Sequence, residues 1–322
     1  MSPQTALAVR TLRTAFINGA DPVQAVQSID FEVAAGQTLV LLGESGSGKS
    51  VTIRSILGLA GANARVEGSV TLHGRELIGQ DLSQVRGAQI ALVPQDPIGA
   101  LDPLRSIGAQ IAEVLRTHLR LSRAAARERT KELLSEVGIA EPTRVARARA
   151  HELSGGMCQR VAIAIAIACE PQVLLADEPT TALDVTVQAQ ILELFTALQA
   201  LRGTAMVLVT HDVGVADQIG GCIAVMYAGR VVETGRTRDV LDAPRHPYTA
   251  GLLASLPGPE IERGHLPFLP GRPPAAGEAT SGCAFAPRCP LAEPSCTLQT
   301  PALVDAGAQR QAACPVVVRD LH

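Results

Sequence analysis

The residues GESGSGKS have the composition and the surroundings of a phosphate-binding loop. They follow the apolar run TLVLL and precede VTIRSILGL, and this strand–loop–helix context is what such a loop requires. Glycines let the backbone curl so that its N–H groups face phosphate, and the helix N-terminus adds the positive end of its dipole. We expect Lys49 to reach the terminal phosphates and Ser50 to ligate Mg²⁺. The predicted nucleotide-binding residues are Gly43, Glu44, Ser45, Gly46, Ser47, Gly48, Lys49, Ser50 and Val51.

Two adjacent carboxylates follow another apolar run, in LLADEP. Asp177 is predicted to hold the Mg²⁺ shell through water, and Glu178 to polarise the attacking water as a general base. Taken alone, the motif also fits a strand that ends in a solvated turn. The phosphate loop earlier in the chain favours the catalytic interpretation.

The segment LSGGM predicts a second anion site. A serine hydroxyl followed by bare glycine N–H groups at a helix start binds anions, and Ser154, Gly155 and Gly156 supply these groups. A single phosphate loop binds its own nucleotide and does not need a second anion site, or phosphate cradle. Two chains that face each other head to tail do need it, because each cradle then closes over the ATP of the other chain. The alternative is an ordinary helix cap with a Gly-Gly turn.

Two further polar residues follow apolar runs, Gln95 in VPQD and His211 in THD. Outside this constellation they would be a surface-loop glutamine and a strand-end histidine. In the order phosphate loop, Gln95, LSGGM, LLADEP and His211, they are typical of an ATP-hydrolysing motor that works as a pair.

Composition excludes several function classes. The chain has 322 residues, 47% hydrophobic and only 2% aromatic, no Trp, and a net charge of −3. Stacking platforms and basic patches for nucleic acid are therefore not indicated. The longest apolar run, residues 161–169, is shorter than the about 20 residues of a membrane span, and the N-terminus shows no signal peptide. We expect a soluble or peripheral chain whose membrane attachment depends on a partner.

The pattern of elements predicts an α/β fold. TLVLLG, QIALVP, VLLAD, AMVLVT and CIAVMY are typical of strands buried in a parallel sheet, whereas LAVRTLRTAF, SIDFEV and SVTLHG alternate like strands of an antiparallel, partly exposed sheet. Residues 103–152 switch to a helical pattern, with Ser122 as a predicted cap. Residues 257–282, with six Pro and five Gly, indicate a linker or an irregular wrap before a Cys-containing tail.

Four cysteines in the tail suggest a metal centre. They are separated by gaps of five, six and seventeen residues, and they are Cys283, Cys289, Cys296 and Cys314. Close C-x₂₋₄-C pairs, which favour zinc, do not occur. Wider spacing and Cys-Pro steps favour a [4Fe–4S] cluster, with Zn²⁺ as the second choice and simple packing of thiols as the third. We expect this centre to lie outside the ATP motifs. Three other cysteines, Cys158, Cys169 and Cys222, are predicted to be packing residues of the motor core.

The stretches VPQDPIGALDP, HELSGGMCQRVAIAIAIACEP, LLADEPTTALDVTVQAQIL and HPYTAGLLASLP resemble the ATP-binding subunit of an ABC transporter. They resemble the oligopeptide/dipeptide (and nickel) importer branch, whose C-terminal extension contains cysteines. This likeness implies that Gln95 touches Mg²⁺ and signals to membrane subunits, that residues 182–184 form the D-loop with Asp184, and that His211 senses the γ-phosphate. Met157 stands where the general family signature has Gln.

The resemblance also implies an organisation and partners. It implies a P-loop NTPase core at residues 1–245, with a helical insert at about 103–155, and an extension at 246–322. The implied partners are two transmembrane permeases, a second and homologous ATPase chain, and indirectly an extracytoplasmic solute-binding protein, at the cytoplasmic face of the membrane. A nickel-chelate importer and a soluble non-transport ATPase remain alternatives.

Two regional interpretations stay open. The insert is either a docking surface for the permease or a solvated helix face, whose arginines are Arg116, Arg120, Arg123 and Arg127. The adenine is expected to stack on Phe16 or, alternatively, to rest on an aliphatic residue such as Val23.

Overall fold

The apolar runs of the sequence form strands in the computed structural model of the chain. The structure describes residues 4–17, 22–256, 269–275, 277–278 and 281–319. These fall into two compact units, each described by itself. The first comprises residues 1–7, 32–38 and 72–209, and the second comprises residues 8–31, 39–71 and 210–322. Much of the predicted linker at 257–282 lies outside the described residues.

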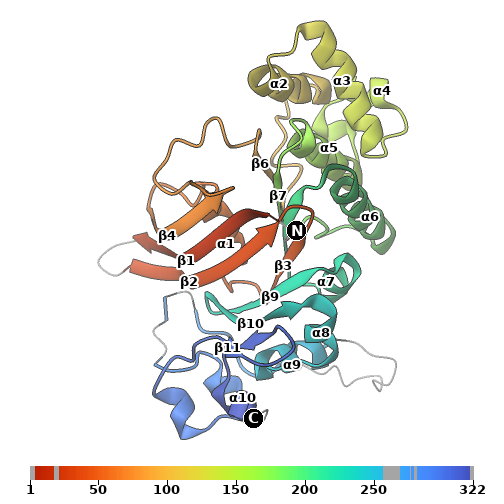
Figure 1. The fold of residues 1–322 in the computed structure, drawn as a ribbon. Helices are drawn as coiled ribbons and strands as arrows, with labels where there is room; N and C mark the ends of the chain where they lie inside the picture. Colours follow the sequence, from red (N-terminus) through yellow and green to blue (C-terminus); the bar gives the residue numbers. More distant parts are fainter. Residues whose placement is uncertain (1–3, 18–21, 257–268, 276, 279–280, 320–322) are drawn as a thin grey trace. The chain divides into compact units, whose positions relative to one another are not determined.

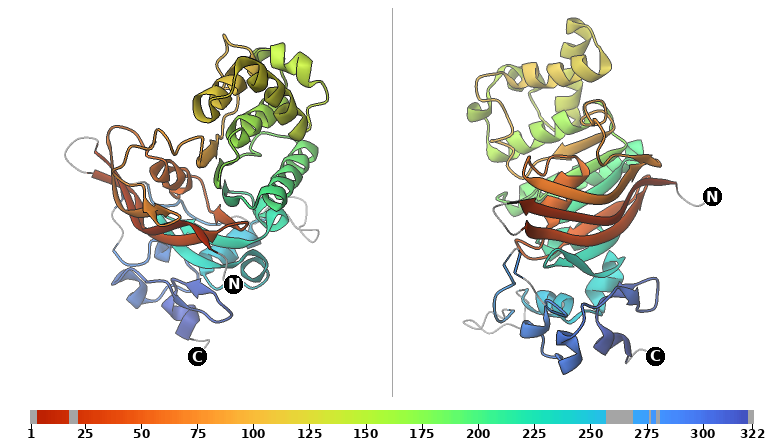
Figure 2. Two further views of the ribbon diagram at one scale, coloured as in Figure 1. Left: turned by 45° about the horizontal axis from the view of Figure 1, so that its top comes forward. Right: turned by 90° about the vertical axis from the view of Figure 1, so that its left-hand side faces the viewer.

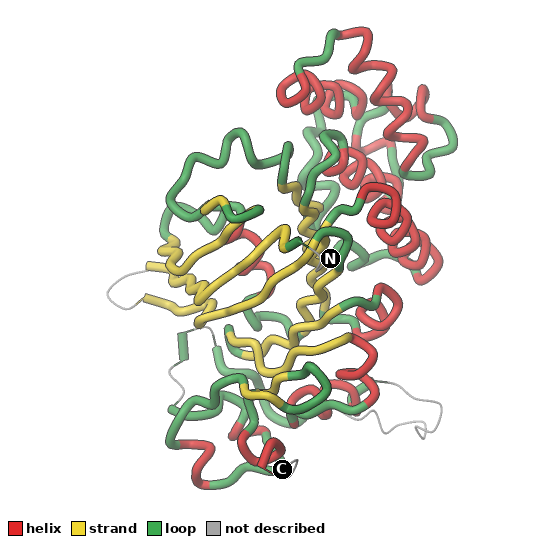
Figure 3. Tube along the Cα trace, in the orientation of Figure 1, coloured by secondary structure: helices red, strands yellow, loops and turns green. Residues whose placement is uncertain are grey.

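Three parallel strands form the sheet of the first unit, in the order β8-β7-β6. They are β6 (Ile90–Val93), β7 (Val173–Asp177) and β8 (Ala205–Thr210). Every residue of β7 and β8 is buried, as expected for strands that are covered on both faces. The prediction of parallel strands for these runs is confirmed. Figure 1 draws strands as arrows, and Figure 3 colours them yellow. The unit also contains the short β5 (Arg75–Glu76).

The predicted helical insert contains α2 (Ile107–Leu119), α3 (Arg123–Glu136) and α4 (Pro142–Arg147). Ser122 caps α3 by accepting a hydrogen bond from the N–H of Ala125, as the sequence indicated. The helices bury one apolar face each, which includes Ile111, Leu115 and Leu133. The short 3₁₀ helix η1 (Ala150–Glu152), α5 (Gly155–Ile167) and α6 (Val185–Arg202) follow.

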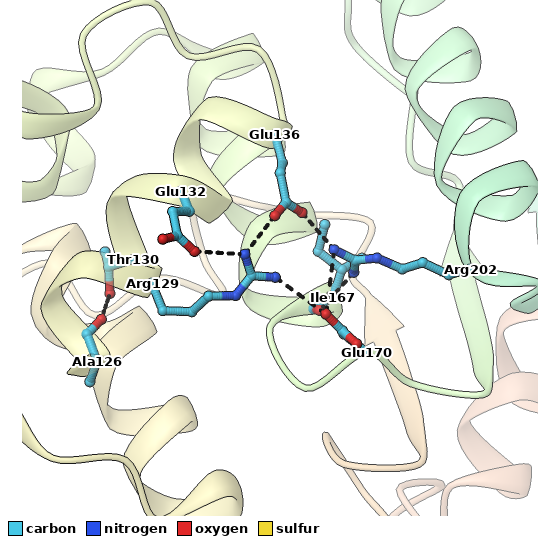
Figure 4. Close-up of polar contacts among 8 residues, drawn as sticks. All are labelled: Ala126, Arg129, Thr130, Glu132, Glu136, Ile167, Glu170 and Arg202. Atoms are coloured by element: carbon cyan, nitrogen blue, oxygen red, sulfur yellow. Dashed lines mark hydrogen bonds and ion pairs between the residues drawn. The ribbon is translucent and has the colours of Figure 1, made fainter.

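An arginine–glutamate network connects helix α3 with α6 (Figure 4). Arg129 on α3 donates to Glu136 at 2.6 Å and to Glu170 at 3.4 Å. Arg202 at the end of α6 donates to the other oxygen of Glu136 at 2.6 Å and to the carbonyl of Ile167 at 3.2 Å. Because Glu136 accepts from both arginines, the network fixes the insert against the two helices that follow it.

The second unit contains a five-stranded arrangement, in the order β11-β12-β10-β9-β3. Strands β3 (Thr38–Leu42) and β9 (Cys222–Tyr227) pair in parallel, and β10 (Arg230–Arg236) continues the sheet antiparallel. Strands β2 (Pro22–Ala34), β1 (Thr5–Ile17) and β4 (Ala64–Leu72) lie side by side in that order (Figure 2). The second unit also contains the helices α1 (Lys49–Ile56), α7 (Val213–Ile219), α8 (Thr237–Asp242) and α9 (Pro247–Ala254).

The C-terminal extension joins the sheet of the second unit. Its elements are η2 (Ala286–Arg288), η3 (Pro294–Thr297), β11 (Val304–Asp305), β12 (Gln311–Ala312) and α10 (Pro315–Arg319). Strand β12 pairs antiparallel with β10 at Glu233↔Ala312. Arg310, just before β12, donates to the fully buried Glu233 at 2.7 Å, so a buried ion pair reinforces this edge. Among the described residues, no helix is long and apolar enough to cross a membrane.

Candidate functional site

The phosphate loop connects β3 to α1 in the second unit. Lys49, 4% exposed, donates from Nζ to the carbonyl oxygens of Gly43 at 2.7 Å and Glu44 at 2.9 Å. Gly48 precedes α1 with a φ of +98°, and a Cβ there would come 2.7 Å from the carbonyl oxygen of Ala25. Only glycine fits this position, because both its φ and its surroundings exclude a side chain. The carbonyl oxygens of Gly43 and Glu44 thus hold the ammonium group of Lys49 within the loop.

Glu178 lies at the end of β7 in the first unit, and two side chains hold its carboxylate. Gln95 donates from Nε2 to Oε2 at 3.2 Å, and Thr181 donates from Oγ1 to the same oxygen at 3.0 Å. The backbone N–H of Glu178 donates to the carbonyl of Val209 at 3.0 Å. Glu178 has a φ of +46°, which is unusual for a residue other than glycine and is found at functional sites. Asp177 is 2% exposed at the last position of the strand.

The structure thus brings the predicted Gln95 and Glu178 together. Thr181 is a contributor that the sequence reasoning missed, although it lies three residues after Glu178 within the quoted stretch LLADEPTTALD. A carboxylate that is oriented by an amide and a hydroxyl is suited to accept a proton from a water molecule.

Two further predicted residues start helices in the first unit. Ser154 caps α5 and accepts from the N–H of Met157 at 3.3 Å, and Gly155 and Gly156 are the first residues of that helix. A Cβ on Gly155 would meet nothing within 4 Å, so this side of the helix start is open. Asp184 caps α6 by accepting from the N–H of Val187 at 3.0 Å. The open helix start has the donors that an anion site needs.

His211 follows β8 and belongs to the second unit, where its side chain is exposed. The next residue, Asp212, caps α7 by accepting from the N–H of Gly214 at 2.7 Å. The roles of these residues toward a single nucleotide, and that of Phe16 or Val23 toward adenine, stay predictions.

The extension reaches the phosphate loop inside the second unit through Arg288 and Tyr248. Arg288 donates from Nη1 and Nη2 to the two carboxylate oxygens of Glu44, at 2.9 and 3.1 Å. The hydroxyl of Tyr248 accepts from the backbone N–H of Glu44 at 2.9 Å. Sequence reasoning missed Arg288 and Tyr248. Their signals were the HPY triplet and an arginine directly before Cys289, but neither indicates which residue it contacts.

The four tail cysteines line one small cavity, together with His246. Burial raises the pKa values of the Cys283, Cys289 and Cys314 thiols, and hydrogen bonds from backbone N–H groups act in the opposite direction. Such N–H donors stabilise thiolates and occur around iron–sulfur clusters. Burial also lowers the pKa of His246 to about 4.

The arrangement of side chains in the described residues supports neither the predicted iron–sulfur cluster nor the zinc ion. Across the described ranges, which include all seven cysteines, no group of three or more His, Cys, Asp or Glu side chains is arranged to hold a metal ion. All seven cysteines are free thiols. Cys158 and Cys169 are buried, as predicted, but Cys222 is exposed. The prediction for Cys222 was wrong because this residue begins β9, before the strand enters the core.

The fold defines a P-loop nucleotide-binding protein with a helical insert and a C-terminal extension. The profile of the family described as ABC transporter matches residues 26–181, and that of the oligopeptide/dipeptide transporter C-terminal region matches residues 232–296. The chain is 42% identical over 315 residues to the oligopeptide transport ATP-binding protein AppD of Bacillus subtilis, covering 96% of each chain. The chain therefore belongs to the ABC transporter ATP-binding family, in its oligopeptide/dipeptide branch.

Another relative is longer than this chain. The chain is 46% identical over 319 residues to the oligopeptide transport ATP-binding protein OppD of Mycobacterium tuberculosis, covering 98% of this chain but 52% of that protein. It thus spans about half the length of that relative. A dimeric, post-hydrolysis structure of the ATP-binding cassette MJ0796, bound to ADP and phosphate, matches with a TM-score of 0.64 and 29% identity, covering 72% of this chain and 99% of that chain.

Proposed function

We propose that this chain binds and hydrolyses ATP to energise an ABC importer of peptides or a similar small solute. The observation that carries the proposal is the carboxylate of Glu178, held by Gln95 and Thr181 at the end of a buried strand, in a chain that also contains a phosphate loop. The peptide as solute is supported by the names of the relatives and by the matched C-terminal region.

Each motif takes one role in this function. Lys49 and the N–H groups of the loop bind phosphates, while Ser50, Gln95 and Asp177 provide oxygen ligands for Mg²⁺, directly or through water. The metal supplies charge neutralisation at the phosphates when bound. Glu178 accepts the proton of the attacking water, and His211 contacts the γ-phosphate.

The chain is proposed to act as one of two motors. Ser154, Gly155 and Gly156 would bind the phosphates of ATP held by the second motor subunit, which is homologous rather than identical, and Asp184 would lie in the D-loop between them. Support comes from the open start of α5 and from the dimeric state named for the similar cassette. The motors would sit at the cytoplasmic face of the membrane on two permeases, fed by a solute-binding protein. The helical insert is proposed as the docking surface.

The cysteines are proposed to hold a [4Fe–4S] cluster. Cys283, Cys289, Cys296 and Cys314 line one small cavity, and their wide spacing without close C-x₂₋₄-C pairs favours a cluster over the zinc ion that was the second choice. The centre would cross-link a segment with little apolar core of its own. The same cysteines could otherwise serve as packing residues, since Cys296 and Cys314 are buried together with Val316.

The experiment that tests the transport function is purification from membranes. We expect the chain to co-purify with two polytopic membrane proteins, and its ATP hydrolysis in proteoliposomes to rise when peptide and the binding protein are added. Co-purification with nucleic acid, and hydrolysis that ignores peptide, would instead support the soluble ATPase alternative.

A further inference from the structure

We propose that Arg288 of the C-terminal extension is a positioning residue for the phosphate loop. Through Glu44 it holds the loop in the conformation that accepts ATP. This inference rests on the proposed function, because it concerns the affinity of the same loop for nucleotide.

The contact between Arg288 and Glu44 has the geometry of a paired, charge-assisted interaction. The two distances of 2.9 and 3.1 Å join separate guanidinium nitrogens to separate carboxylate oxygens. Such a fork fixes the direction of both side chains as well as their separation. The Arg288 side chain is 5% exposed and that of Glu44 is 25% exposed, so water screens the pair only in part. The pair therefore constrains where Glu44 lies.

The guanidinium of Arg288 is held independently of the loop. Its Nε donates to the carbonyl oxygen of Pro270 at 2.9 Å, and Nη1 also donates to the hydroxyl of Tyr227 at 3.2 Å. Its central carbon lies 5.7 Å from the ring centre of Tyr227 and 5.9 Å from that of Phe285, within the range of cation–π attraction. These contacts come from the extension and from β9. The guanidinium group of Arg288 is therefore already in position to bind the carboxylate of Glu44.

Glu44 is held at its backbone as well. Its N–H donates to the hydroxyl of Tyr248, a fully buried side chain whose ring lies 4.6 Å from that of Tyr227. Its carbonyl oxygen accepts from Nζ of Lys49 at 2.9 Å. One residue thus joins the guanidinium of Arg288 to the ammonium that is predicted to bind phosphate. A shift of Glu44 would move the carbonyl that helps to place Lys49.

The contact between Arg288 and Glu44 also connects the cysteine module (residues 283–314) to nucleotide binding. Arg288 ends η2, between Cys283 and Cys289, and the N–H of Cys289 donates to the carbonyl of Ala286 at 3.2 Å. The N–H of Cys283 donates to the carbonyl of Cys296 at 2.7 Å. Loss of order in this module would therefore release Arg288 from Glu44.

The test measures equilibrium binding of ATP to the full chain, together with KM and kcat of the assembled transporter. Arg288→Gln should weaken ATP binding and raise KM about tenfold while kcat changes less than about twofold, because the variant alters the loop and not the reacting groups. Glu44→Gln should have a similar effect, and the double variant should be no worse than either single one, because both remove the same interaction. Arg288→Lys, which keeps the charge without the fork, should be intermediate.

Arg319→Gln is the matched control, since Arg319 pairs with Glu293 at 2.9 Å on the exposed surface of the same extension. It should leave ATP binding unchanged. Thermal unfolding shows whether each variant is folded. If Arg288→Gln does not fold, the ATP affinity of Arg288→Lys tests the inference instead. Unchanged ATP affinity in a folded Arg288 variant, or additive losses in the double variant, would overturn the inference. Absence of ATP binding by the unaltered chain would instead contradict the proposed function.

Discussion

Replacement of Arg310 by Met should detach the C-terminal extension from the sheet of the second unit. Glu233 is fully buried and Arg310 is 4% exposed, so the substitution leaves a buried carboxylate without its cation. Removing one partner of a buried pair costs about 3–5 kcal/mol. The N–H groups of Arg245 and His246 still donate to the two Glu233 oxygens, at 2.7 and 2.9 Å. We therefore expect a loss near the lower end, about 3 kcal/mol.

The assay is urea unfolding followed by tyrosine fluorescence. The chain has no Trp and two Tyr, and both Tyr227 and Tyr248 are buried in the second unit, so the signal comes from the region of interest. Hydrogen exchange gives a local readout, because the N–H of Ala313 donates to the carbonyl of Val232 at 2.8 Å and should lose protection.

Two comparison variants make the result specific. Adding Glu233→Gln to Arg310→Met removes the stranded charge, but the amide NH₂ then faces one of the two backbone N–H donors, so the variant should recover less than half of the loss. Arg319→Met breaks the exposed pair with Glu293 and should cost less than about 1 kcal/mol. If Arg310→Met cost no more than Arg319→Met, the reasoning about a buried, uncompensated carboxylate would be refuted.

Three further predictions concern the ATP motifs and the cysteines. Glu178→Gln should retain ATP binding while phosphate release falls by about 10²–10⁴-fold, because the base is lost; normal turnover would contradict the assignment. Lys49→Ala should weaken ATP binding to the isolated chain about tenfold or more, whereas Ser154→Ala should lower turnover and spare that binding; equal weakening would contradict the head-to-tail arrangement. Anaerobically purified protein should contain iron and acid-labile sulfide near four per chain, and Cys289→Ser should lose both; one zinc per chain, or no metal, would overturn the cluster.

The sequence by itself determined the phosphate loop, the parallel strands and the helical insert. These features depend on short-range order: glycines and a lysine at fixed spacing, fully apolar runs of strand length, and serine caps before periodic helices. Ser122 and Ser154 cap helices as their sequence positions predict, because a cap involves only residues three positions apart. The same local logic placed Glu178 at a strand end.

Only the tertiary structure decided which residues hold these groups in place. The contacts of Gln95 with Glu178 and of Arg202 with Glu136 join residues 83 and 66 positions apart, and they arise from packing that no local pattern encodes. The exposure of Cys222 likewise depends on where a strand enters the core.

The contact of Arg288 with Glu44 is the clearest case. The two residues are 244 positions apart, and the intervening chain includes strands β4 to β10 and the linker. A lone arginine beside a cysteine and a glutamate within a glycine-rich loop each have many possible partners in a sequence. The fold selects one of them, because pairing of β12 with β10 and burial of Tyr248 bring the extension against the loop. Long-range pairing of this kind is a property of the folded chain and not of any segment within it.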